Sequence, residues 1–277
     1  MSLTPEEHVT QWANLFDHLS SSYDQTGVPF FSVIAEGLVQ RLAPVAGERA
    51  LDVGVGRGAV TFPLADAVGP QGSVDAIDIA PGMVQLTTQA VRDRGLDHVH
   101  VQLGDAADPR LTPGTYDLIA ASLMMFFLPE PERSLPRWVA LLRPGARLGV
   151  STFRPWHGHW QEIETVFDDH LEDTGRPSPT SMPEVFRTDE GVAGMLSDAG
   201  LHDVRTAVET FVIPFEDVEE WRVWSLGTAM RGLWLRTPQD AHPHILERVA
   251  AILEESRGVD GRMGLEVDIR YTVGRRA

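Results

Sequence analysis

Hydrophobic residues at the start of the chain recur at helical spacing. Thr4, followed by Pro5 and by Glu7, predicts a helix N-terminus with a capping box. The apolar positions that continue this pattern are Val9, Trp12, Phe16 and Leu19. A second helical pattern runs over 30–42 and stops before Pro44. The chain therefore opens with two helices.

From residue 49 the rhythm changes to short apolar runs that alternate with helical patterns. The runs typical of strands cover 51–55, 73–79, 99–103, 116–122 and 147–153. The helical patterns between them cover 59–68, 81–94 and 132–142. Gly and Pro residues mark the returns between these segments. Such alternation predicts a parallel, doubly wound α/β sheet.

After residue 153 the alternation breaks. We expect a helix over 161–171 and another that is capped by Thr188 and ends at Gly200. The remaining expected elements are a long strand over 204–215, two helices within 216–255 and a closing strand over 267–273. We expect these later segments to add two strands to the sheet and helices around it.

Composition and charge narrow the class of protein. The 277 residues are 43% hydrophobic, which suffices for one large α/β domain with additions. A formal net charge of −17 repels phosphate backbones and argues against nucleic acid as a partner. Because the chain has no cysteine, disulfides, thiolate metal sites and cysteine nucleophiles are excluded. We find no signal peptide and no apolar stretch of about 18 residues to insert in a membrane, so we expect a cytoplasmic protein.

A glycine-rich turn follows the first predicted strand and carries the main functional signal. Gly54 and Gly56 would let the backbone approach a ligand closely, and Gly58 would allow the next helix to pack. Asp52 precedes this turn and adds a negative charge that suits a cationic, nucleoside-bearing ligand. Two other interpretations stay open: a relaxed dinucleotide fingerprint that ends at Ala59, and a tight turn without a ligand.

Acidic and hydroxyl residues stand at the ends of the next strands, where a doubly wound sheet binds its ligands. Asp78 follows Gly58 at about the distance expected for an acid that accepts hydrogen bonds from ribose hydroxyls. Asp105, next to Ala106, could accept a hydrogen bond from an adenine amino group. Ser122 ends the fourth strand and faces the same edge of the sheet.

These segments together resemble class I S-adenosylmethionine (SAM)-dependent methyltransferases, and in particular the small-molecule group of the ubiquinone/menaquinone-biosynthesis type. The matching segments are 51–59, 74–79, 104–106, 116–122 and 142–148, with the lead-in 15–24 upstream. The resemblance implies a Rossmann-like, doubly wound sheet of seven strands, the last antiparallel, with a helical cap. It also implies SAM as the cofactor.

The expected cofactor contacts follow from these motifs. They are Tyr23, Asp52, Gly54, Gly56, Arg57, Gly58, Asp78, Ile79, Met83, Asp105, Ala106 and Ser122. In relatives the helix that carries Tyr23 folds over the cofactor. Arg57 departs from the small or hydroxyl residue that is common at its position, so we expect its side chain to point outward.

The resemblance also suggests how the chain is divided. Residues 1–44 would form a helical lid, and 45–215 with 266–277 the SAM-binding domain. Residues 216–265 would form an inserted cap, and 154–187 would contribute to the acceptor pocket. The sequence leaves open whether the protein is a monomer or a homodimer.

Catalytic candidates lie just after the fifth strand. His157 or His159 could act as a general base, because imidazole titrates near neutrality, although methyl transfer can also proceed by alignment without a base. Trp156 and Trp160 could stack an aromatic acceptor. No third ligand accompanies the two histidines, so we expect no metal.

We therefore predict a SAM-dependent methyltransferase that transfers a methyl group to O, N or C of a small organic acceptor. The aromatic residues of 211–234 favour an aromatic or lipophilic acceptor, as in secondary-metabolite or quinone-type biosynthesis. The alternatives are an NAD(P)-dependent oxidoreductase on a Rossmann fold and a non-catalytic SAM-binding sensor or assembly protein.

Overall fold

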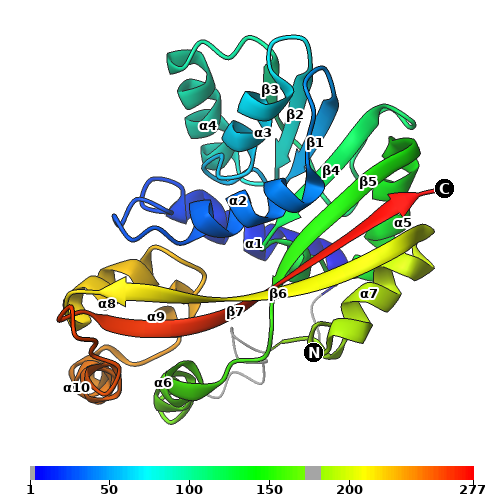
Figure 1. The fold of residues 1–277 in the computed structure, drawn as a ribbon. Coiled ribbons are helices and arrows are strands. Elements are labelled where there is room, and N and C mark those ends of the chain that lie inside the picture. Colours follow the sequence, from blue (N-terminus) through cyan, green and yellow to red (C-terminus); the bar gives the residue numbers. More distant parts are fainter. Residues whose placement is uncertain (1–3, 172–181) are drawn as a thin grey trace.

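A seven-stranded sheet forms the centre of the molecule (Figure 1), with strand order β3-β2-β1-β4-β5-β7-β6. The computed structural model describes residues 4–171 and 182–277. The strands are β1 (Arg49–Val53), β2 (Ser73–Asp78), β3 (Val99–Leu103), β4 (Tyr116–Ser122), β5 (Leu142–Phe153), β6 (Leu201–Phe215) and β7 (Met263–Arg276). The pairs among β1 to β5 are parallel, whereas β7 is antiparallel to β5 and β6. The predicted fold class is confirmed.

Helices flank the sheet. They are α1 (Pro5–Leu19), α2 (Phe31–Leu42), α3 (Thr61–Val68), α4 (Pro81–Asp93), α5 (Pro131–Leu141), α6 (Gly158–Asp168), α7 (Asp189–Asp198), α8 (Val218–Leu226), α9 (Arg231–Leu235) and α10 (His242–Glu254). Short 3-10 turns are η1 (Met125–Phe127), η2 (Glu184–Phe186) and η3 (Gln239–Ala241). Thr4 and Glu7 form the predicted capping box. None of the helices in the described ranges is long and apolar enough to cross a bilayer.

Two apolar layers hold the helices against the sheet. On one face α2 packs over β4, β5 and β7, with Ile34 and Leu38 fully buried. A side chain at Gly149 would come within 2.9 Å of Leu42, so this glycine lets α2 approach β5 closely. On the other face Leu135 and Trp138 of α5 are fully buried in the second layer. Burial of such side chains is worth roughly 1.5–3 kcal/mol each.

The structure differs from the sequence expectation mainly after residue 141. β5 begins at Leu142 rather than at Arg147, and β6 and β7 are longer than predicted. Their pairing continues to Phe215↔Met263 and carries both strands past the rest of the sheet. Three helices and a 3-10 turn, rather than two helices, connect β6 to β7. Because β6 ends at the carboxyl edge of the sheet, these helices lie on the ligand side.

Candidate functional site

The glycine turn after β1 has a backbone that only glycine adopts easily. Gly54, Gly56 and Gly58 have φ values of +80°, +49° and +88°. A side chain at Gly54 would come within 2.9 Å of Met124, and one at Gly58 within 2.4 Å of Phe62. The absence of side chains therefore lets Met124 and Phe62 pack closely against the turn, while Gly54 and Gly56 border a cavity.

Asp78 ties this turn to the end of β2. Its Oδ2 accepts a hydrogen bond of 2.8 Å from the Gly56 amide, and its Oδ1 accepts one of 2.9 Å from the Ala80 amide. Burial raises the pKa of this carboxyl, while the amide hydrogen bonds oppose that shift. Each carboxylate oxygen can accept a further hydrogen bond. Asp78 can therefore hold the turn and still accept hydrogen bonds from a pair of hydroxyls.

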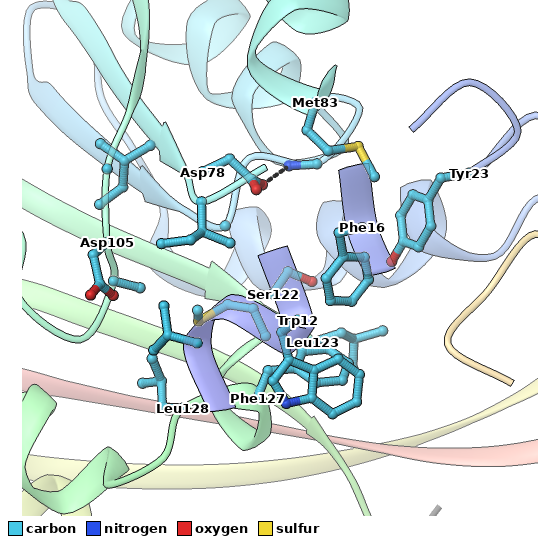
Figure 2. A pocket seen from close by; sticks show the side chains of 18 of the residues that line it. Trp12, Phe16, Tyr23, Asp78, Met83, Asp105, Ser122, Leu123, Phe127 and Leu128 are labelled. Carbon is cyan, nitrogen blue, oxygen red and sulfur yellow. Dashed lines mark hydrogen bonds between the residues drawn. The ribbon is translucent and has the colours of Figure 1, made fainter. Parts of the chain in front are cut away.

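A first cavity opens beside the turn and spans about 760 Å³, part of it open to solvent (Figure 2). We call it the donor cavity, after the methyl donor expected from the sequence. Nine of the twelve predicted cofactor residues line it: Tyr23, Gly54, Gly56, Asp78, Ile79, Met83, Asp105, Ala106 and Ser122. Helix α1 closes one side with Val9, Trp12 and Phe16, and Tyr23 lies in the turn after this helix rather than on a helix as expected. The sequence therefore identified residues that the fold gathers, although their cofactor contacts stay predictions.

Three of the predicted residues do not line the donor cavity. Gly58 lies against the Phe62 ring, where an added Cβ would clash. Asp52 is 1% exposed, and its Oδ2 accepts a 2.6 Å hydrogen bond from the Thr61 hydroxyl. Burial, with the nearby charge of Asp78 as a lesser cause, raises the pKa of Asp52 to about 7. In this position Asp52 supports the turn from behind.

Arg57 does not line the donor cavity either, and its half-buried side chain turns toward the end of α1. Its Nη1 donates a 2.7 Å hydrogen bond to the carbonyl oxygen of Ser20, the residue that ends α1. A second polar link joins α1 to the cofactor side of the sheet, because the Gly82 amide donates a 2.7 Å hydrogen bond to Asp17 Oδ1. The lid is thus held by both polar and apolar contacts.

A second cavity spans about 900 Å³, part of it open to solvent, and is dominated by aromatic rings. We call it the acceptor cavity, after the acceptor expected from the sequence. Its ten aromatic lining residues are Trp12, Tyr23, Phe30, Phe31, Phe126, Phe127, Phe153, Trp156, Trp160 and Trp224. The others are Leu123, Met182, Pro183, Thr228, Ala229 and Met230. No Asp, Glu, Lys, Arg or His occurs among the described residues that line this cavity. Such a wall suits a flat, apolar molecule.

The two cavities share four lining residues: Trp12, Tyr23, Leu123 and Phe127. Leu123 has an unusual φ of +50° for a branched residue. Its amide donates hydrogen bonds to the carbonyl and hydroxyl oxygens of Ser151, at 3.0 and 3.2 Å, which hold this backbone in place. Strained backbone of this kind is concentrated at functional sites. We call this shared region the junction.

The structure does not bring the predicted catalytic histidines to either cavity. His157 Nε2 lies 3.3 Å from Asp268 Oδ2, and His159 Nε2 lies 4.0 Å from Glu255 Oε2. Their neighbours Trp156 and Trp160 do line the acceptor cavity, where their rings stack at 4.4 Å. A catalytic role for either histidine therefore stays a prediction that would require movement.

Some lining residues had only a weak sequence signal. Trp12 and Phe16 had the helical periodicity of a core face, and Phe127 stood in the apolar run 123–128, in which the sequence indicates core at most positions and one or two pocket residues. The positive φ of Leu123 has no sequence signal. Among the described residues, no group of three or more His, Cys, Asp or Glu side chains could hold a metal ion.

The glycine turn, Asp78 and both cavities lie at the carboxyl edge of a doubly wound sheet, where α/β proteins of this type bind nucleoside ligands. A family model described as a methyltransferase domain matches residues 50–145. Nocamycin O-methyltransferase of Saccharothrix syringae is 31% identical over 94% of this chain and 97% of its own length. Aklanonic acid methyltransferase DauC of Streptomyces sp. is 40% identical over 53% of this chain and 66% of its own length.

A solved structure agrees on the fold. An N-methyltransferase of Haemonchus contortus, in complex with phosphomonomethylethanolamine and S-adenosylhomocysteine, has a TM-score of 0.61 and 14% identity, over 99% of this chain and 60% of its own. The chain belongs to the class I SAM-dependent methyltransferases. It is an enzyme whose cofactor is SAM, and the glycine turn and the Asp78 carboxylate fit that cofactor. The comparisons give no support to the nicotinamide-dependent alternative.

Proposed function

We propose that this enzyme transfers the methyl group of SAM to an oxygen atom of a small, planar and largely apolar acceptor. The observation that carries the proposal is the junction, where a cavity with cofactor-type residues meets an aromatic cavity. An acceptor in the second cavity would meet the donor there. This geometry favours a single line of approach, as in-line displacement requires.

The lining of the acceptor cavity supports the proposed acceptor class. Trp156 and Trp160 stack on one another, and Phe30 and Phe153 lie nearly parallel, with ring centroids 6.3 Å apart. Rings in such orientations can stack against the face of a flat aromatic ligand. A small, highly charged acceptor would lose its hydration against these walls without gaining a charged partner from the described residues.

The choice of oxygen comes from the relatives. A protein described as an O-methyltransferase shares 31% identity over 94% of this chain and 97% of its own length. When bound, SAM supplies an electrophilic methyl group on a sulfonium. The chain's own part is to bind the acceptor, align its oxygen and exclude water with α1 and the aromatic wall. The new O–CH₃ bond replaces the S–CH₃ bond, whose electron pair stays on sulfur, and a hydroxyl acceptor releases its proton to solvent.

The proposal is tested by turnover with SAM and a panel of compounds that share one polycyclic skeleton. Members carry a phenol, a carboxylic acid, an amine or an activated carbon, and a fully O-methylated member is the matched blank. We expect S-adenosylhomocysteine together with a methyl ether or methyl ester. Methylation confined to amines or carbon would contradict the choice of oxygen, and a preference for small charged acceptors would contradict the acceptor class.

A further inference from the structure

Tyr23 occupies the junction between the donor and acceptor cavities and lines both of them. Neighbouring rings hold its own ring in place. Phe31 stacks on it at 4.7 Å with an interplanar angle of 29°, and Phe16 meets it edge-on at 5.9 Å. The ring therefore has little freedom to turn, and the position of its hydroxyl is set by the fold.

The hydroxyl of Tyr23 has no hydrogen-bond partner within residues 4–171 and 182–277. Figure 2 shows it turned toward the interior of the cavity, on the side of Phe16 and Trp12. The other two tyrosines differ, since Tyr116 donates to Asp75 and Tyr271 donates to the Ile34 carbonyl. The Tyr23 hydroxyl is therefore available to donate a hydrogen bond to a ligand in the cavity.

The protonation state of Tyr23 fixes which kind of partner it can take. Burial raises its pKa far above the usual value, and the nearby charges of Asp24 and Asp78 add to this shift. The phenol therefore keeps its proton at physiological pH and cannot serve as a general base. It can donate a hydrogen bond to a lone pair at the junction.

We infer that the Tyr23 hydroxyl donates a hydrogen bond to the acceptor's oxygen and so selects oxygen acceptors and orients them toward the methyl donor. This inference rests on the proposed function and goes beyond the cofactor contact expected of Tyr23. An acceptor oxygen that receives this hydrogen bond through one lone pair keeps another for the methyl group. An acceptor that places a hydrogen or carbon atom against Tyr23 leaves the Tyr23 hydroxyl without a hydrogen-bond partner.

The experiment separates acceptor binding from cofactor binding. The probes are 2-naphthol and its isostere 2-methylnaphthalene, measured by equilibrium dialysis against protein saturated with S-adenosylhomocysteine. The proteins are the parent, Tyr23→Phe, and the matched control Tyr116→Phe, whose hydroxyl bonds to Asp75 away from both cavities. Cofactor affinity is measured on each protein by calorimetry.

We expect the parent and Tyr116→Phe to prefer 2-naphthol by about three- to tenfold, the effect of one hydrogen bond. Tyr23→Phe should lose this preference and keep its affinity for S-adenosylhomocysteine within about twofold. A preference that persists in Tyr23→Phe, or an equal loss in Tyr116→Phe, would overturn the inference. So would a drop in cofactor affinity that matches the loss of preference. If the parent binds neither probe, the acceptor cavity itself is refuted, and the proposed function falls with the inference.

Discussion

Arg57 Nη1 donates a 2.7 Å hydrogen bond to the carbonyl oxygen of Ser20, which joins the glycine turn to the end of the lid helix α1. A guanidinium at a helix C-terminus also meets the negative end of the helix dipole. The same turn that borders the donor cavity thus fixes the helix that covers it. Cofactor retention and lid position should therefore be linked.

Arg57→Ala should loosen this lid. The loss of its hydrogen bond to Ser20 should let α1 move away from the donor cavity, so we expect S-adenosylhomocysteine to bind about three- to tenfold more weakly, mainly through faster dissociation. The effect is indirect, because the Arg57 side chain does not line the donor cavity. Stopped-flow displacement measures that rate. The matched control is Arg49→Ala, which removes a half-exposed arginine at the opposite end of β1. Equal dissociation rates in the parent and Arg57→Ala would contradict the link.

Asp78→Asn should weaken cofactor binding by about ten- to a hundredfold, since hydrogen bonds to a charged group are worth roughly 1.5–3 kcal/mol. The amide oxygen can still accept one backbone hydrogen bond, so the turn should persist. Calorimetry with S-adenosylhomocysteine gives the affinity. The control is Asp108→Asn, an exposed carboxylate that does not line the donor cavity. An unchanged affinity in Asp78→Asn would remove this residue from the cofactor site.

Asp52 should make stability depend on pH. Its pKa is raised to about 7 in the folded protein, so its protonated form favours folding at low pH, and this contribution is lost as pH rises from about 4 to 7. Asp52→Asn keeps a hydrogen-bond acceptor for Thr61 and cannot ionise. Relative to the parent, its free energy of unfolding should rise by up to a few kcal/mol across that window. Urea titrations at several pH values test this, and a constant difference would argue against a raised pKa.

Trp156→Leu should remove one side of the stacked pair in the acceptor cavity. We expect kcat/KM for a polycyclic acceptor to fall by about tenfold while cofactor affinity is retained, because an aromatic stacking contact is worth roughly 0.5–1.5 kcal/mol beyond its buried area. Leu235→Ala, an exposed residue of α9, is the control. If cofactor affinity fell by the same factor as kcat/KM, the substitution would have disturbed the structure of the whole site and not the acceptor cavity alone.

The histidine variants decide the catalytic role predicted from the sequence. Since neither His157 nor His159 lines a cavity, we expect His157→Gln and His159→Gln to keep kcat within about threefold. The pH profile of kcat should also keep its shape. A fall of about a hundredfold or more in either variant would restore the general base and require a rearrangement of the segment that follows β5.

The sequence predicted local features of the fold well. The capping box at Thr4, the alternation of strands and helices, and the glycine turn each depend on neighbouring residues, so they leave readable patterns. The length of β7 depends on pairing with β6, which is distant in sequence and leaves weaker signals.

The site divides in the same way. Asp78 and Asp105 were found because strand ends meet at one edge of a parallel sheet. The contribution of Phe127 depends on how α1 and η1 pack together, which no single-segment pattern encodes. The burial of Asp52 behind the turn likewise depends on its partner Thr61 in α3.

We expect methyl transfer where the donor and acceptor cavities meet. A crystal structure with S-adenosylhomocysteine should place the nucleoside on Asp78. It should place the sulfur at the junction formed by Trp12, Tyr23, Leu123 and Phe127. A sulfur that faces away from the aromatic cavity, or a ligand bound outside the glycine turn, would contradict it.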